Sequence, residues 1–250
     1  MSLRLYLDAP LAAGSELELP DEAARHVQVR RLQPGDALRL FDGRGGEWIG
    51  EVLRMGRRDV AVRVDTHVDV DREPPFELEI ALGMPTNERM DTLVEKATEL
   101  GVAAIQPLQT ERSVLRLDGE RAARRVAHWQ AVAVGAAEQS GRTRVPAVRP
   151  VRSLAAWFAE LDAEGTPGHR LVMSTGDAPA LGAVVRAQAP GGEARPRWVA
   201  LSGPEGGFSA DEEAAAATFG FARVSLGGLV MRSDTAPLAW LAAMAVLLAP

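Results

Sequence analysis

Residues 76–250 alternate short apolar runs with longer segments in which apolar side chains recur at helical spacing. The run at 76–82 alternates like a strand, and residues 90–100 then follow the period of a helix that Gly101 would end. Similar strand-like runs lie at 104–108, 171–174, 199–202 and 221–226, and a long helix is expected at 120–139. This alternation predicts an α/β domain with a mostly parallel sheet.

Two helix starts are marked in the second half of this region. Ser209 precedes Glu212 by three residues, which is the pattern of a capping box. Pro237 is expected in the first turn of the last helix, where a missing N–H does no harm.

Residues 1–72 have a different pattern. Short strands are expected at 3–7, 38–41, 47–53 and 60–64, with a short helix at 21–31. Turn signals separate them, and Arg72-Glu73-Pro74-Pro75 has the composition of a linker. The sequence therefore predicts a small β-barrel or open sheet at 1–72, followed by the α/β domain at 73–250.

Composition removes several classes of site. The chain of 250 residues has no cysteine, which excludes disulfides, thiolate metal sites and cysteine nucleophiles, and we predict no metal. The net charge of −6 excludes a uniformly basic surface of the kind that coats nucleic acid. Lys96 is the only lysine, and the other cationic residues are arginines. The longest apolar stretch, 239–249, is too short to span a bilayer, and acidic residues interrupt the N-terminus. We expect a cytoplasmic protein that does not enter the membrane.

Glycine-rich segments follow two of the predicted strands, at 201–209 and 225–235. In a parallel sheet, ligands bind beyond the carboxyl ends of the strands, and glycine lets backbone approach a ligand closely. Neither segment has the Gly-Lys-Ser/Thr ending of a phosphate loop, and Glu205 would repel phosphates. A ligand with a cationic centre and an adenine-like ring fits better than a nucleoside triphosphate. Tight strand-to-helix turns are the alternative.

Several motifs in order along the chain resemble one family. These are residues 203–209 (Gly-Pro-Glu-Gly-Gly-Phe-Ser), 226–227 (Leu-Gly), 231–236 (Met-Arg-Ser-Asp-Thr-Ala), 89–91 (Arg-Met-Asp), 95–102 (Glu-Lys-Ala-Thr-Glu-Leu-Gly-Val), 111–113 (Glu-Arg-Ser) and 138–142 (Glu-Gln-Ser-Gly-Arg), together with His26-Val27, Arg30-Arg31-Leu32, Gly35-Asp36 and Phe41-Asp42-Gly43 near the N-terminus. The chain resembles the RsmE family of SPOUT methyltransferases, the bacterial 16S rRNA (uracil(1498)-N(3))-methyltransferases. The resemblance covers nearly the whole chain.

The resemblance implies a PUA-like RNA-binding β-barrel followed by a SPOUT domain with a trefoil knot in a mostly parallel sheet. It implies a homodimer that transfers a methyl group from S-adenosylmethionine (SAM) to N3 of a uridine in 16S rRNA of the small ribosomal subunit. By resemblance the cofactor lies against Met173, Ser174, Leu201, Gly203, Gly206, Leu226, Gly227, Leu229 and Met231, mostly through backbone groups.

Catalytic candidates follow from the chemistry of uracil. Because N3 carries a proton, the enzyme must remove it and stabilise the resulting charge. Arg232 is the candidate for charge stabilisation, and Glu205, Glu138 and Asp234 are candidates for the base. Asp234 replaces the Glu usual in the family, and an N-cap of the last helix is its alternative role. A helix-end ion pair with Arg142 is the alternative for Glu138.

RNA is expected to contact Arg25, His26, Arg30, Arg31 and Arg142, through phosphates that fix register. Three other interpretations stay open at this point. The chain could methylate another RNA, such as a tRNA base or ribose; it could be a non-catalytic RNA-binding module; or it could be a nucleotide-binding enzyme of another class, which the missing phosphate-loop lysine disfavours.

Overall fold

The computed structural model describes residues 2–57, 59–165, 168–188 and 195–249. The chain forms two compact units. The first unit consists of Met1–Glu73 and Ala137–Val145, and the second of Pro74–Ala136 and Pro146–Pro250. The first unit therefore includes a short segment taken from the middle of the chain.

The first unit contains a mixed sheet with the strand order β1-β3-β4-β5-β2. Its strands are β1 (Arg4–Tyr6), β2 (Glu16–Glu18), β3 (Ala37–Phe41), β4 (Glu47–Met55) and β5 (Val60–Val68). β1 pairs with β3 in parallel, and the remaining pairs are antiparallel. Helix α1 (Asp21–Val29) buries Ala23, Ala24 and Val27 against the sheet core. The strands and helix expected in this region are confirmed, and β2 is an addition.

The second unit contains a parallel sheet with the order β12-β10-β11-β6-β7-β8. Its strands are β6 (Glu77–Gly83), β7 (Ala104–Gln109), β8 (Ala147–Val148), β9 (Arg152–Ser153), β10 (His169–Met173), β11 (Arg197–Ser202) and β12 (Ala222–Val224), with β9 beside β7. Central strands such as β11 are buried along most of their length, as the apolar runs predicted. The predicted parallel α/β architecture is confirmed.

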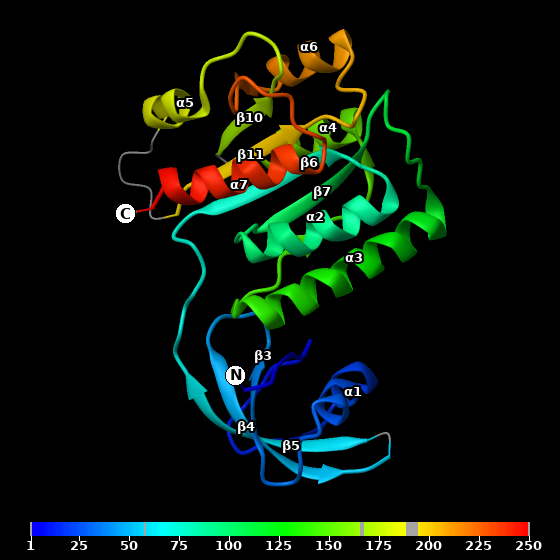
Figure 1. Cartoon of the computed structure of the whole chain (residues 1–250), viewed down its shortest axis with the longest axis vertical. Helices are drawn as coiled ribbons and strands as arrows, with labels where there is room; N and C mark the ends of the chain where they lie inside the picture. Colours follow the sequence, from blue (N-terminus) through cyan, green and yellow to red (C-terminus); the bar gives the residue numbers. More distant parts are fainter. Residues whose placement is uncertain (1, 58, 166–167, 189–194, 250) are drawn as a thin grey trace. The chain divides into compact units, whose positions relative to one another are not determined.

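Helices cover both faces of this sheet (Figure 1). The helices after β6 are α2 (Asn87–Glu99), α3 (Gly119–Ser140), α4 (Leu154–Glu164), α5 (Leu181–Gln188), α6 (Ala210–Thr218) and α7 (Thr235–Leu247). α3 packs on α2, where Trp129 donates to Asp91, and its last residues belong to the first unit. On one face, α4 and α6 enclose an aromatic core with Val199 and Leu201 of β11. On the other face, α7 packs on β6 and β11 and against α2. No helix within the described residues is long and apolar enough to cross a membrane.

The helix-start signals are borne out. Ser209 accepts a hydrogen bond from the Glu212 N–H while Glu212 accepts one from the Ser209 N–H, which completes the capping box. Pro237 lies in the first turn of α7. Helices α4 and α5 were not predicted, although Ser153 caps α4 by accepting from the Ala156 N–H.

Candidate functional site

Loops from neighbouring strands gather at the carboxyl edge of the parallel sheet. β12, β10 and β11 are adjacent, so the segments after Val224, Met173 and Ser202 all leave the same edge. Met173 pairs with Val224 in register, and Ser174 is fixed to β12 because its N–H donates to the Val224 carbonyl at 2.9 Å. The residues predicted to bind the cofactor therefore lie at the ends of these three strands or on the segments that follow them.

The first glycine-rich loop, residues 203–209, is tightly packed. A Cβ on Gly203 would lie 3.2 Å from the Cα of Gly207. Arg112 holds the loop from outside by donating to the Gly206 carbonyl at 3.0 Å. Leu201, near the end of β11, is fully buried in the core beneath α4 and α6, so its side chain is not available to a ligand.

Glu205 lies on the same loop, and its carboxylate is partly exposed. Arg89, in the first turn of α2, approaches it at 3.6 Å. The ion pair holds the Glu205 carboxylate beside the glycine-rich backbone. A carboxylate in this position can accept a proton or pair with a cationic ligand. Nearby on α2, hydrogen bonds to Glu95 and Glu99 raise the pKa of Lys96 to about 12, which fits the surface ion pair that its spacing predicts.

The second glycine-rich loop follows β12. The Ser225 hydroxyl accepts from the Gly227 N–H, while Leu229 and Val230 are 85% and 81% exposed. Arg232 is exposed, and within the described residues its guanidinium has no hydrogen bond or ion pair. The loop thus presents apolar side chains and a free cation.

Ser233 and Asp234 differ from the rest of this loop. The Oγ of Ser233 and Oδ1 of Asp234 are buried and make no hydrogen bond within the described chain. Asp234 occupies the N-cap position of α7 without a side-chain cap bond, so that part of the N-cap expectation is wrong. The reason is Pro237, which has no N–H to offer, while the Ala236 N–H already donates to the Arg232 carbonyl.

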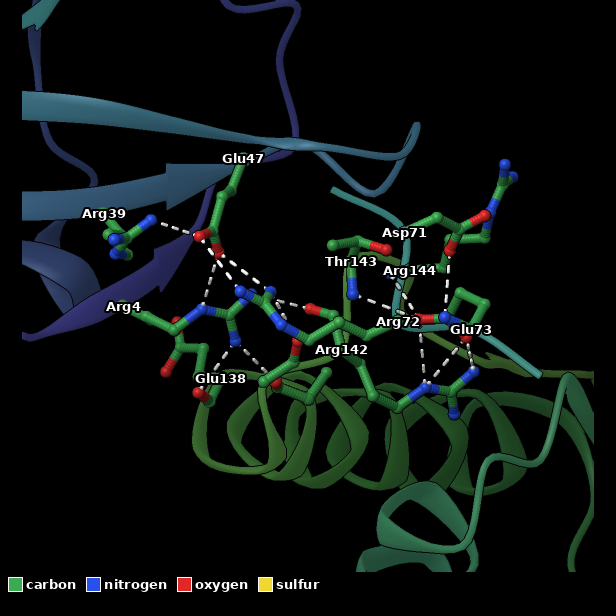
Figure 2. A network of polar contacts seen from close by, with 12 residues as sticks. Arg4, Arg39, Glu47, Asp71, Arg72, Glu73, Glu138, Arg142, Thr143 and Arg144 are labelled. Atoms are coloured by element: carbon green, nitrogen blue, oxygen red, sulfur yellow. Dashed lines mark hydrogen bonds and ion pairs between the residues drawn. The ribbon is translucent and has the colours of Figure 1, made fainter. Parts of the chain in front are cut away.

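A polar cluster occupies the first unit (Figure 2). We define it as Arg4, Arg39, Glu47, Arg72, Glu73 and Arg142. Glu47, 1% exposed, lies between Arg39, Arg4 at 3.3 Å and Arg72 at 3.2 Å. Burial raises the pKa of Glu47, but the hydrogen bond from Arg72 and the three positive charges outweigh burial and leave that pKa lowered.

Glu138 also belongs to the first unit. Its Oε1 accepts from the Tyr6 N–H at 2.9 Å, and its Oε2 lies 3.6 Å from Nδ1 of His26. Burial raises the pKa of Glu138, against the smaller lowering effects of the Tyr6 N–H and the His26 charge. Glu138 therefore has a structural attachment in this unit, and its catalytic role remains a prediction.

The residues predicted to contact RNA fall into two groups. Arg25, His26, Arg30 and Arg31 are exposed on α1 or just beyond it. Arg142 is buried, and its guanidinium pairs with Glu73 rather than with Glu138. The helix-end pair considered for Glu138 is thus replaced by a pair between Arg142 and Glu73 of the linker, and the RNA contact of Arg142 stays a prediction.

The structure places Arg232, Glu205 and the cofactor-binding candidates in the second unit, and Glu138, His26 and Arg142 in the first. Sequence reasoning missed the cluster residues Arg4, Glu47 and Glu73. The one available signal was Glu47, an acidic residue at the start of an apolar strand. Among the described residues, no group of acidic or histidine side chains could hold a metal ion.

Comparison with known proteins gives a consistent result. A protein-family model described as an RNA methyltransferase domain matches residues 72–245, and a second family model, described as an RNA methyltransferase PUA domain, matches residues 19–65. The chain is 31% identical to ribosomal RNA small subunit methyltransferase E of Synechocystis, covering 99% of this chain and 78% of the relative. It is 32% identical to the protein of that name from Mycobacterium bovis, covering 91% and 84%.

Solved structures agree with these sequence matches. A ribosomal RNA small subunit methyltransferase E from Neisseria gonorrhoeae, bound to S-adenosyl methionine, superposes with a TM-score of 0.88 at 34% identity, over 99% of this chain and 98% of that one. A protein from Legionella pneumophila in complex with SAM gives 0.89 at 32% identity, over 98% of each chain.

Proposed function

Because the chain belongs to the ribosomal RNA small subunit methyltransferase E family, we propose that it methylates N3 of one uridine in 16S rRNA of the small ribosomal subunit. The enzyme class is a SAM-dependent rRNA methyltransferase with a PUA-like domain and a SPOUT-type domain. The position within the rRNA follows from the family resemblance. The trefoil knot stays part of this proposal.

The observation that carries the proposal is that two glycine-rich loops leave the same edge of the parallel sheet, one after β11 and one after β12. The backbone at Gly203 is so close to Gly207 that a side chain would crowd it, which suits a loop that wraps a ligand through its backbone. SAM would lie against Met173, Ser174, Gly203, Gly206 and the loop of Leu226, Gly227, Leu229 and Met231, with the Leu201 backbone beneath. When bound, SAM supplies an electrophilic methyl group.

The protein's own residues must handle the uracil proton. Arg232 carries a free guanidinium on the loop before α7, and it would stabilise negative charge on the uracil oxygens once N3 loses its proton. Glu205 would accept that proton, since its carboxylate is partly exposed on the glycine-rich loop at 203–209, 3.6 Å from the Arg89 guanidinium. Glu138 is a second candidate for the base, and burial raises its pKa, which favours proton acceptance.

RNA binding is assigned to the first unit. Arg25, His26, Arg30 and Arg31 are exposed there, and guanidinium groups suit phosphate oxygens. Arg142 is buried against Glu73, and it would contribute to RNA binding by fixing the conformation of the loop that follows α3. The target base must leave its stack to reach the cofactor edge.

A homodimer in the cytoplasm completes the proposal. Leu229, Val230 and Val246 are exposed apolar residues of the last loop and α7, and α7 itself is apolar on nearly every side. Such a helix is normally covered on more than one face. Light scattering of the purified protein would show twice the chain mass.

The test is methyl transfer from labelled SAM to small ribosomal subunits that lack the modification. We expect label on N3 of one 16S uridine, identified by nucleoside mass. Arg232→Ala should keep SAM binding and lower the rate by about 10²–10³-fold.

Each other outcome identifies an alternative. If the protein binds SAM but 16S rRNA is not labelled, the substrate is another RNA, and tRNA would be tested next. RNA binding without SAM binding would indicate a non-catalytic module. Full activity of Arg232→Ala would remove that residue from the mechanism.

A further inference from the structure

The carboxylate of Glu73 organises the loop that follows α3. Its Oε1 accepts the N–H groups of Thr143 at 3.0 Å and Arg144 at 3.1 Å, and its Oε2 accepts Nε of Arg142 at 3.1 Å. The two side chains of the ion pair are 2% and 9% exposed. One buried carboxylate therefore fixes three consecutive residues.

Arg4 and Arg72 hold the same loop from its other end. The guanidinium of Arg4 donates to the carbonyls of Ala137, Glu138 and Arg142 at 2.8–3.1 Å. Arg72 donates to the Gly141 carbonyl at 3.2 Å. The Ala137 and Glu138 carbonyls belong to the last turn of α3, and the Gly141 and Arg142 carbonyls belong to the loop, so these bonds tie the loop to the helix end.

This geometry separates two arginines that lie two residues apart. Arg142 is buried on Glu73, whereas Arg144 is exposed. Within the described residues, the Arg144 guanidinium has no hydrogen bond or ion pair, and only its backbone N–H is engaged. The loop thus presents Arg144 and not Arg142 to a partner.

A second exposed arginine lies on the adjoining turn. A Cβ on Gly45 would lie 3.6 Å from Nη2 of Arg144, so this turn touches the Arg144 side chain. The neighbouring Arg44 is 68% exposed on its side chain, and its nearest carboxylate, Asp42, is 3.9 Å away. By contrast, Arg39, Arg54 and Arg63 of the same unit each have a close carboxylate partner.

We propose that Arg144, with Arg44 beside it, contacts phosphate oxygens of the RNA substrate, and that Glu73 and Arg142 act as positioning residues for this contact. The inference rests on the proposed function, because it takes RNA as the substrate. Planar guanidinium groups bind phosphate with two parallel hydrogen bonds, and a rigid loop loses little freedom when it does so.

The experiment measures binding of unmodified small ribosomal subunits at several salt concentrations. Arg144→Gln should weaken binding about fivefold to tenfold near 0.1 M salt and reduce the salt slope by about 0.7–0.9, because one phosphate contact is lost. Arg144→Lys should keep most of the slope because it keeps the charge. Arg63→Gln is the matched control, since it removes the same charge from a paired arginine and should leave the slope unchanged.

Two further readouts separate a contact from a structural role. SAM affinity and the rate at saturating subunits should match wild type in Arg144→Gln, with the loss confined to KM for the subunits. An unchanged slope in Arg144→Gln, with wild-type protein binding and methylating the subunits, would overturn the contact and leave the proposed function standing. Wild-type protein that neither binds nor methylates RNA would overturn both. An equal loss of affinity and salt slope in Arg63→Gln would show that the effect comes from the net charge of the protein, and it would overturn the contact at Arg144.

Discussion

The polar cluster of the first unit and the loop before α7 in the second unit differ in whether their charged and polar side chains are paired. In the cluster every charged side chain has a partner, and Glu47 is shared by three arginines. In the loop, Arg232 is free, Ser233 and Asp234 bury polar atoms without a hydrogen bond, and Leu229 and Val230 are exposed.

The difference indicates two kinds of role. Buried polar groups cost free energy unless they are paired, so a fully paired cluster stabilises its own unit. Unpaired groups beside exposed apolar side chains are retained where another molecule completes them. The cluster therefore stabilises the fold, and the loop has the features that the proposed cofactor site and the proposed dimer require.

The largest expected effect is on stability. Glu47→Ala would remove the buried carboxylate that Arg4, Arg39 and Arg72 share. Because Arg39 and Arg72 are 38% and 44% exposed and water can solvate them, the free energy of unfolding should fall by about 2–3 kcal/mol. Glu51→Ala, which breaks the half-exposed pair with Arg63, should cost about 0–1 kcal/mol. Urea unfolding followed by hydrogen exchange at residues 37–68 would measure both. Equal losses would erase the contrast between the cluster and the surface.

Next comes cofactor binding in the second unit. Gly203→Val would push a side chain into Gly207 and should weaken SAM affinity by more than about tenfold, while the fold is kept. Gly135→Val, on an exposed position of α3 with open space around it, is the control and should bind SAM normally. Isothermal titration with SAM measures the effect. Unchanged affinity in Gly203→Val would remove this loop from the cofactor site.

A smaller effect concerns pH within the first unit. The lowered pKa of Glu47 means that its stabilising contribution is present above the unfolded-state value near 4.3 and is lost as pH falls through the folded-state pKa. Glu138 has the opposite sign: its raised pKa means that stability is present below about 4.3 and is lost as pH rises through the folded-state pKa.

Urea unfolding of Glu138→Gln against wild type tests this sign. The variant should gain relative stability as pH rises from about 4 to 7. A relative loss over the same interval would show that its partners, Tyr6 and His26, outweigh burial.

The smallest expected effect is on the loop surface. Val230→Ser should change the free energy of unfolding by less than about 0.5 kcal/mol, because the side chain is 81% exposed. It should nevertheless lower the dimer fraction measured by analytical ultracentrifugation at low concentration. A marked loss of stability in dilute monomeric protein would place this side chain in the core instead.

Sequence patterns predicted the architecture well where periodicity was strong. The buried runs of β6, β7 and β11, the capping box at Ser209 and the position of Pro237 needed no tertiary information. β2 escaped prediction because three residues of a partly exposed edge strand carry little pattern. The family was recognised because several motifs occurred in order, and the comparisons confirm it.

The site was harder to read from the sequence. The two glycine-rich loops leave the same edge of the sheet because β11 and β12 run parallel on either side of β10, which a topology argument anticipates. The burial of Arg142 could not be anticipated, because its partner Glu73 lies 69 residues earlier in the chain. Neither could the failed cap at Asp234 be called from residue preference alone, although Pro237 three residues later holds the explanation.

Residues 137–145 have one more consequence. Because these residues complete the first unit, residues 1–73 are not expected to fold correctly on their own. A fusion protein that carries only residues 1–73 would leave Arg4 and Glu73 without the loop that they bind. Exchange of the first unit between relatives would require replacement of two separate gene segments, one for residues 1–73 and one for residues 137–145. Variation in this protein is therefore expected to accumulate by point substitution rather than by shuffling of its front half.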